Sequence, residues 1–133
     1  MEVVHPPVAF EDDRGRIIDV LQALDFNSAT LITTRKGVTR GNHSHKLTTQ
    51  WVYILRGRML AHSRLPGGNA TRAELNAGDL LKNVPGEDHA LTALEDTEFL
   101  VLSSGPRSGV DYEKDTYRLD QPLHEPEAST GAS

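Results

Sequence analysis

Hydrophobic residues in this chain form many short runs separated by turn-forming residues, and none has the length and 3.6-residue period of a long helix. Residues 29–34 are rich in β-branched side chains and residues 51–55 form a β-prone apolar run, while residues 58–64 alternate, with Met59, Ala61 and Ser63 on one face. Further strands are predicted over residues 17–21, 71–75, 79–84, 89–94 and 97–103. Short strands at this spacing predict an all-β sandwich or barrel.

The composition changes after Gly105, where a glycine- and proline-containing loop begins. Residues 121–133 have too little apolar content to order themselves. We therefore expect one domain over residues 1–119, a barrel over about residues 29–104, and a flexible tail over residues 120–133. The length of 133 residues suits one domain with a core of its own.

Several classes of protein are disfavoured by what the sequence lacks. There is no cysteine, so a disulfide framework and a thiolate metal site are excluded. The first residues have neither a positively charged start nor a long apolar run, and no stretch reaches the apolar length that spans a bilayer. We therefore expect a cytoplasmic protein with no signal peptide and no membrane partner.

Charge is distributed unevenly along the chain. The formal net charge is −5, which argues against a dedicated nucleic-acid binder. Between Phe26 and Ala73 there are eight lysines and arginines and no acid, whereas from Asp111 onward there are six acids and only two lysines and arginines. This basic segment predicts either a small anionic ligand bearing phosphate or carboxylate, or solvated strand edges that acids elsewhere balance.

The histidines carry the candidate chemistry. His43 and His45 are two residues apart, so on an extended strand their rings project from the same face. Gln50 begins the following strand, and His89 comes just after a tight turn. Because an antiparallel barrel makes sequence-distant strands neighbours, we expect these four residues to converge on one site.

The spacing of these residues resembles the cupin superfamily. The first cupin motif is matched by Gly37, His43, His45, Gln50 and Gly57. Gln50 departs from it, since the family usually has glutamate there. The second motif is matched more loosely by Gly78, the Pro85-Gly86 turn and His89, with Ala93 where asparagine is common. Membership of this superfamily implies a double-stranded β-helix, the cupin or jelly-roll barrel.

A narrower resemblance exists to cupins that remodel nucleotide-linked sugars. Residues 10–16 (FEDDRGR) resemble the opening of dTDP-sugar 3,5-epimerases and dTDP-keto-sugar 3,4-ketoisomerases. Residues 37–46 (GVTRGNHSHK) are similar to the ketoisomerases and to the cupin half of capsular-polysaccharide sugar epimerases, which also carry a sequence close to Asp115-Thr116-Tyr117. The resemblance implies a biosynthetic isomerase or epimerase of a nucleotide-linked keto-sugar, and a homodimer.

Such a reaction needs a base with a pKa near neutral, which histidine supplies. By the resemblance His43 or His45 is this base, and Tyr53 or Tyr117 protonates the enolate. The residues expected to bind the substrate are Arg14, Arg40 and Lys46. For Arg14 and Arg40 the alternative is a structural salt bridge.

The same histidines also suit a metal ion. Three imidazoles and an amide oxygen, from His43, His45, Gln50 and His89, can hold a divalent ion such as Zn, Ni, Fe or Mn. No organic cofactor is expected. Two further functions follow as alternatives: a metal-dependent dioxygenase, decarboxylase, cyclase or dehydratase acting on a small organic acid or polyketide, and a non-catalytic module that binds a sugar or a metal.

Overall fold

A computed structural model describes residues 1–105 and 114–123, and within them the regular structure is almost entirely β-strand. The strands are β1 (Glu2–Val4), β2 (Val8–Asp12), β3 (Gly15–Ile18), β4 (Ser28–Thr34), β5 (Thr39–Ser44), β6 (Thr49–Arg56), β7 (Arg58–Arg64), β8 (Thr71–Asn76), β9 (Leu80–Asn83), β10 (Asp88–Ala93), β11 (Thr97–Ser104) and β12 (Tyr117–Arg118). The predicted all-β class is confirmed. No helix in the described ranges has the length and apolar character to cross a membrane.

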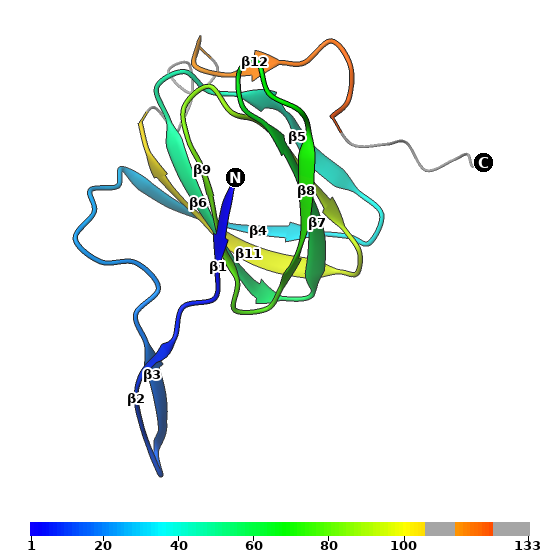
Figure 1. Cartoon of the computed structure of the whole chain (residues 1–133). Helices are drawn as coiled ribbons and strands as arrows, with labels where there is room; N and C mark the ends of the chain where they lie inside the picture. The colour runs from blue at the N-terminus through cyan, green and yellow to red at the C-terminus, as the bar shows by residue number, and fades with distance from the viewer. Residues whose placement is uncertain (106–113, 124–133) are drawn as a thin grey trace.

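Two five-stranded antiparallel sheets form the barrel (Figure 1). One has the strand order β1-β9-β6-β11-β4 and the other the order β12-β5-β10-β7-β8. Alternate residues of both sheets point inward and form one apolar core, in which Ile54, Met59 and Leu75 are completely buried and Phe99 is 1% exposed. The predicted double-stranded β-helix is therefore the observed architecture.

Two very short strands complete the barrel outside the range predicted for it. β1 pairs with β9, and β12 pairs with β5. Strands of three and two residues leave no periodic signal in the sequence, and they form because each one covers an otherwise open sheet edge. Of the predicted tail, residues 124–133 lie outside the described residues.

The β2–β3 hairpin forms a separate two-stranded sheet that projects away from the barrel (Figure 1). Phe10 and Ile17 lie directly opposite each other in this hairpin, and they are 52% and 58% exposed. A two-stranded hairpin is marginally stable by itself in water, so this apolar pair leaves an interaction unmade within one copy of the chain.

Trp51 is buried, as its sequence context suggests, but on the outer face of its sheet. Gln50 and Val52 point into the barrel, so the alternation of β6 directs Trp51 outward. Its ring meets that of Phe26 at a centroid distance of 6.2 Å with the planes 70° apart. The segment before β4 therefore folds back over this face.

Candidate active site

A bulge in β5 decides which side chains of this strand enter the barrel. Arg40 and His43 are three residues apart, so a regular strand would direct them to opposite faces. The β5–β10 ladder shifts register between His89 and Ala90, which leaves Asn42 as an extra residue on β5. Asn42 has a φ of 58°, a left-handed conformation that asparagine adopts more readily than most residues. Because of this bulge, both Arg40 and His43 line the same cavity.

Gly41 allows the two strands to approach at the bulge. A Cβ atom at this position would lie 2.8 Å from the carbonyl oxygen of His89 and 3.1 Å from the Cα of Ala90. The φ of Gly41 is 98°, a value that residues with side chains rarely adopt. The short run from Arg40 to His43 thus acts as one structural unit, and its glycine is required by close backbone contact.

Three histidines meet inside the barrel, as the sequence predicts. One nitrogen from each of His43, His45 and His89 lies within 4.8 Å of the others. The ring centroids are 4.7 Å apart for His43 and His45, 4.8 Å for His43 and His89, and 5.4 Å for His45 and His89. Strands β5 and β10 are direct neighbours, and this pairing brings residues 43 and 89 side by side.

Backbone carbonyls set the tautomers of two of these rings. His45 Nδ1 lies 3.0 Å from the carbonyl oxygen of Asp115, and His89 Nδ1 lies 3.1 Å from that of Glu87. A carbonyl can only accept, so each Nδ1 must carry the hydrogen, and each Nε2 presents a lone pair. By contrast, His43 Nδ1 is buried and has no hydrogen-bond partner among the described residues.

Burial keeps His43 and His89 uncharged at neutral pH. It is the largest cause that lowers the pKa of His43 to about 3, followed by the nearby charges of His89, His45 and Arg118. Burial likewise lowers the pKa of His89 to about 4, with His45 adding to the effect. A neutral imidazole offers a lone pair that can bind a metal ion. A pKa of about 3 is well below the near-neutral value expected of a general base, so use of His43 as the base requires the negative charge of a bound substrate to raise it.

The donor set also fits a divalent metal ion. Two of the three imidazoles donate their Nδ1 hydrogen to a backbone carbonyl, which is the usual arrangement of metal-binding histidines. The buried Nδ1 of His43 lacks a protein partner in the described ranges, and Gln50 lines the same cavity. Neutral nitrogen and oxygen donors suit zinc and its neighbours among the transition metals.

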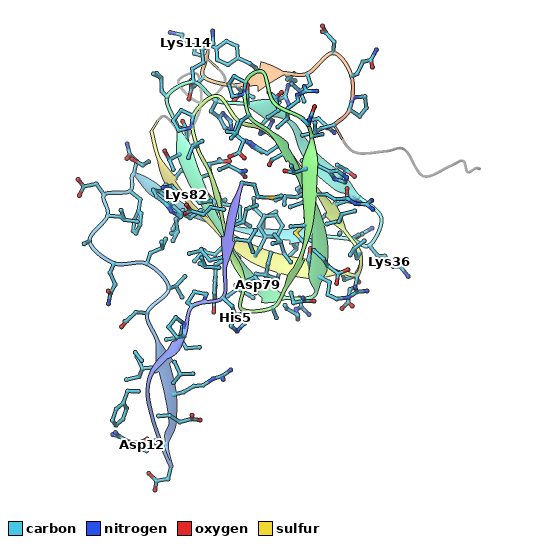
Figure 2. All side chains as sticks on the ribbon, in the orientation of Figure 1. His5, Asp12, Lys36, Asp79, Lys82 and Lys114 are labelled. Carbon is cyan, nitrogen blue, oxygen red and sulfur yellow. The ribbon has the colours of Figure 1, made fainter. Side chains whose placement is uncertain are left out.

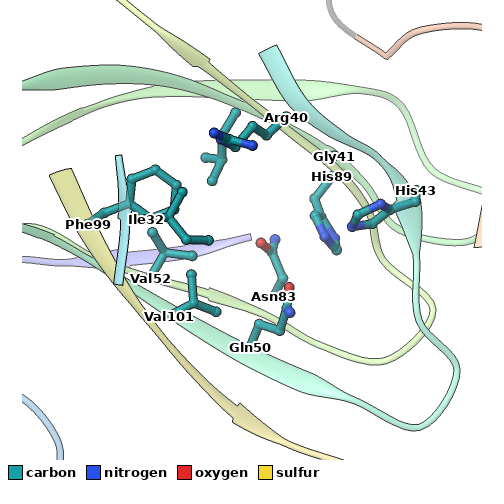
Figure 3. A pocket seen from close by; sticks show the side chains of 11 residues that line it. Ile32, Arg40, Gly41, His43, Gln50, Val52, Asn83, His89, Phe99 and Val101 are labelled. Atoms are coloured by element: carbon teal, nitrogen blue, oxygen red, sulfur yellow. The ribbon is translucent and has the colours of Figure 1, made fainter. Parts of the chain in front are cut away.

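A cavity of about 240 Å³ adjoins the histidines. Its polar residues are His43, His89, Gln50, Asn83 and Arg40, and its other side chains are apolar. Figure 3 shows the two histidines at one end, the apolar group that includes Phe99 at the other, and Arg40 across the space from Gln50 and Asn83. His45 does not line this space and is 2% exposed, so it supports the site from behind.

Asn83 is a cavity residue that the sequence analysis missed. It lies opposite Gln50 in the β6–β9 ladder, so the two side-chain amides enter the cavity next to each other. Asn83 is 3% exposed and Gln50 is 8% exposed. The available signal was a polar residue two positions after Leu81, on the inward face of an otherwise apolar strand.

Arg40 keeps a positive charge that no carboxylate neutralises. Its Nε donates to Thr34 Oγ1 at 2.7 Å, and its Nη2 donates to the carbonyl of Thr33 at 2.9 Å. Both acceptors are neutral, and within the described ranges Arg40 forms no salt bridge. The guanidinium is therefore oriented by the barrel while its charge remains available to a ligand.

Two other arginines of the basic segment, and Arg14 outside it, are paired with acids. Arg58 bonds both Glu74 and Glu95, and Arg64 bonds Asp88. Arg14 lies at the tip of the projecting hairpin, where its 82% exposed side chain pairs with Asp12. Of the two arginines for which a structural salt bridge was the alternative role, Arg14 forms one within a single copy of the chain and Arg40 does not.

The predicted proton donors and Lys46 lie away from the cavity. Tyr53 points to the outer face of β6, where it lines a separate surface pocket with His5. Tyr117 lies opposite Ser44 in the β5–β12 ladder and is 41% exposed. Lys46 places its Nζ 4.4 Å from the centre of the Tyr117 ring. In the part of the chain that the structure describes, no tyrosine lines the cavity beside the histidines.

Two residues near the histidines were not assigned by the sequence analysis. Arg118 lies opposite His43 in the β5–β12 ladder, and its charge contributes to the lowered pKa of His43. Asp115 is 3% exposed and holds the turn that follows β5. Both come from the segment after the barrel, where the sequence carries no periodic pattern that would bring them to the site.

The chain is similar to a known protein family and to solved structures of enzymes that act on sugars. The family model for the polysaccharide biosynthesis C-terminal domain matches residues 10–116. A 3,4-ketoisomerase from Thermoanaerobacterium thermosaccharolyticum, a double mutant in complex with TDP, is 26% identical with a TM-score of 0.72, over 88% of this chain and 86% of that one. The dTDP-4-dehydrorhamnose 3,5-epimerase from Sulfolobus tokodaii is 25% identical with a TM-score of 0.69, over 80% and 71%.

A curated relative matches a smaller part of its own length. The UDP-2-acetamido-2,6-beta-L-arabino-hexul-4-ose reductase of Pseudomonas aeruginosa is 27% identical over 99 residues. The match covers 68% of this chain and 25% of that reductase. The chain therefore spans about a quarter of the length of this relative.

Proposed function

Because the chain belongs to the family of polysaccharide biosynthesis C-terminal domains, we propose that it is an isomerase or epimerase that moves a proton on a nucleotide-linked keto-sugar. The observation that carries the proposal is a neutral His43 in a small cavity that also holds two amides and an unneutralised arginine. The similar structures include a ketoisomerase solved with TDP and a dTDP-sugar epimerase. The predicted cytoplasmic location stays a prediction.

His43 is the base in this proposal, because it lines the cavity and His45 does not. Its ring takes the proton from the carbon next to the keto group, so a C–H bond breaks and an N–H bond forms. The electron pair of the C–H bond moves toward the carbonyl oxygen, which gives an enolate. In an isomerisation the proton of the neighbouring hydroxyl group then moves to the enolate oxygen, and His43 returns its proton to the former carbonyl carbon. In an epimerisation water delivers a proton to the same carbon from the opposite face, since no described tyrosine lies in the cavity, and His43 releases its proton to solvent.

The amides of Gln50 and Asn83 have a role in this step. They enter the cavity next to each other, across the space from Arg40 (Figure 3). Their N–H groups can donate to the enolate oxygen as negative charge develops there. Donors fixed in a buried site stabilise such a charge more strongly than water does.

The cavity has room for the sugar ring of the substrate but not for its nucleotide. About 240 Å³ is below the roughly 300–1,000 Å³ that encloses a drug-sized ligand. A sugar ring is the part that enters, and the nucleotide remains outside. Arg40 both lines the cavity and is exposed to solvent, so it lies where a phosphate leaving the cavity would pass. Its planar fork suits a diphosphate.

Arg40→Ala is expected to abolish stabilisation by nucleoside diphosphates. In this proposal, millimolar dTDP, UDP or GDP binds the native protein and raises its melting temperature by several degrees. The matched control is Arg72→Ala, which removes an exposed arginine on β8 and should leave the shift unchanged. Differential scanning fluorimetry measures both. An unchanged melting temperature of the wild type with all three nucleotides would contradict the proposed ligand class.

A divalent metal ion is a second element of the proposal. His43, His45 and His89 would hold it, with Gln50 as a neutral oxygen donor. A bound ion would polarise the keto oxygen and stabilise negative charge on it. Gln50 offers no charge to offset that of the ion, so its affinity should be lower than that of a site with glutamate.

The reaction itself can be tested with hydrogen exchange. The protein is incubated in D₂O with dTDP- and UDP-linked 4-keto-6-deoxy sugars, and NMR follows the carbons next to the keto group. We expect deuterium to enter at one of these positions, together with an isomerised or epimerised product. Ligand stabilisation without exchange would instead indicate a non-catalytic binding module. Oxygen consumption or loss of carbon dioxide would indicate the metal-dependent alternatives.

We also propose that the chain forms a homodimer through its projecting hairpin. Phe10 and Ile17 on the hairpin and Leu31 and Leu55 on the β1-β9-β6-β11-β4 sheet are all exposed, between 45% and 58%. The hairpin extends away from its own barrel, so a second chain is needed to cover it (Figure 1). Reciprocal docking would bury both apolar surfaces of both copies at once.

Phe10→Asp is expected to convert this dimer into a monomer, because it places a charge in the buried interface. Size-exclusion chromatography with light scattering measures the mass. Val38→Asp is the matched control, since Val38 is 45% exposed in the turn before β5 and lies outside the hairpin. A wild-type protein that has the mass of a single chain would contradict the dimer.

A further inference from the structure

We infer that Asp115 is a positioning residue that holds His45 and selects its tautomer. The inference concerns the site of the proposed function and rests on that site, but it is stated for the protein without metal or substrate. Asp115 lies 70 residues after His45, beyond the last long strand of the barrel. It nevertheless makes its contacts with residues 45–48, the turn that joins β5 to β6.

Two parts of Asp115 act on this turn. Its carboxylate accepts hydrogen bonds from the backbone N–H of Lys46 at 3.0 Å, from that of Leu47 at 3.0 Å, and from Thr48 Oγ1 at 2.7 Å. Its backbone carbonyl accepts the Nδ1 hydrogen of His45 at 3.0 Å. The side chain therefore fixes the turn, and the same residue orients the ring at the start of that turn.

These groups are buried, so each polar atom among them needs a hydrogen-bond partner within the protein. Asp115 is 3% exposed, Thr48 is 1% exposed and His45 is 2% exposed. A buried carboxylate is stable only when donors surround it, and its removal would leave the buried Thr48 hydroxyl and the partly buried N–H groups of Lys46 and Leu47 without their acceptor. We expect that loss to move the backbone of residues 114–116, and with it the carbonyl that His45 needs.

The rest of the segment extends the same support along β5. β12 pairs with His43 and Ser44, and the N–H of Leu119 donates to the carbonyl of Asn42 at 2.9 Å. The N–H of Leu123 donates to Asn42 Oδ1 at 2.7 Å. The segment therefore follows β5 from its bulge to the turn after it, and Asp115 is its buried anchor at the His45 end.

The tautomer of His45 is the direct readout. Two-bond ¹H–¹⁵N spectra of the metal-free protein distinguish a ring protonated at Nδ1 from one protonated at Nε2. We expect His45 of the wild type to be a single Nδ1–H tautomer. Asp115→Ala should give a mixture of the two tautomers, because the ring then loses a fixed acceptor at Nδ1. His89, whose Nδ1 faces the carbonyl of Glu87, should keep its tautomer in the variant.

Two further variants separate positioning from general stability. Asp96→Ala removes another carboxylate that accepts a backbone N–H across the fold, that of Lys36 at 2.9 Å, and it does not contact the histidines. It should change the melting temperature without changing the spectrum of His45. Asp115→Asn keeps the shape and one acceptor oxygen, so it should keep more of the Nδ1–H form than Asp115→Ala and guards against a variant that does not fold.

Zinc titration by calorimetry gives the second readout. Loss of such a supporting contact typically weakens metal binding about 10- to 100-fold, and we expect this range for Asp115→Ala. A wild-type protein that shows the single Nδ1–H tautomer but binds no zinc would refute the metal site and leave the positioning role standing. A single Nδ1–H tautomer in Asp115→Ala, with a melting temperature lowered as in Asp96→Ala, would overturn the positioning role.

Discussion

His43→Ala is expected to lower the deuterium exchange of a nucleotide-linked keto-sugar by about 10²- to 10⁴-fold, the usual contribution of one general base. His43 lines the cavity, its Nδ1 is buried without a partner in the described part of the chain, and burial keeps it neutral. No tyrosine among the described residues lines the cavity to replace it. The measurement is the NMR exchange assay, run under identical conditions for the two proteins.

His5→Ala is the matched control for this substitution. His5 bonds Asp79 at 2.8 Å on the outer face of the barrel, and its side chain is 66% exposed (Figure 2). It should exchange the substrate at the rate of the wild type. If His43→Ala exchanged the substrate as fast as the wild type, His43 would not be the base. The next candidate would be His89, the other ring in the cavity.

Metal content decides how the His43 result is understood. Elemental analysis of the untagged protein should find a divalent ion if the three-histidine site holds one, and His89→Ala should lose it as well as His43→Ala. If a chelator removes the ion and the exchange rate does not change, the ion is not needed for proton transfer. The rings would then act by acid–base chemistry alone.

Gly41→Ala should destabilise the barrel more than an ordinary glycine substitution. The new Cβ would lie 2.8 Å from the carbonyl oxygen of His89, and a φ of 98° is unfavourable for alanine. Forcing a group into a packed site costs about 1–3 kcal/mol. The left-handed conformation adds about 1–2 kcal/mol. Urea unfolding measures the sum, and the displaced His89 should also reduce the exchange activity.

Gly67→Ala separates the two contributions. Gly67 also has a positive φ, of 73°, but no atom lies within 4 Å of the position that its Cβ would occupy. This variant should lose only the conformational part of the free energy of unfolding and should keep full activity. Equal losses in the two variants would show that contact with β10 does not constrain residue 41.

Local pattern was sufficient for much of the fold and for the centre of the site. Alternating strands and turn signals predict an all-β barrel, because each strand must turn its apolar face inward whichever strand becomes its neighbour. Alternation along a strand predicts His43 and His45 on one face, and although β5 ends at Ser44 the two ring centroids lie 4.7 Å apart. The turn before His89 returns that ring to the same region. These inferences need only the chemistry of neighbouring residues.

The sequence was less informative where the pattern breaks. A regular β5 would have separated Arg40 from His43, and only the bulge at Asn42 brings both into the cavity. The bulge depends on contact between Gly41 and the backbone of β10, which is nearly 50 residues away in the chain. By contrast, regular alternation along β6 is enough to place Tyr53 on the face opposite to Gln50, which points inward.

Tertiary structure alone decided which residues support the site. Asn83 joins Gln50 because β9 and β6 pair in one particular register, and Asp115 reaches His45 because the segment after the barrel folds back along β5. Arg14 is separated from the cavity for the same kind of reason, since its hairpin projects from the barrel. Within this cupin the sequence determined the strands and the convergence of the histidines, because both follow from alternation along the chain. Register, bulges and the return of the last segment depend on contacts between distant residues, and these form only when the barrel closes.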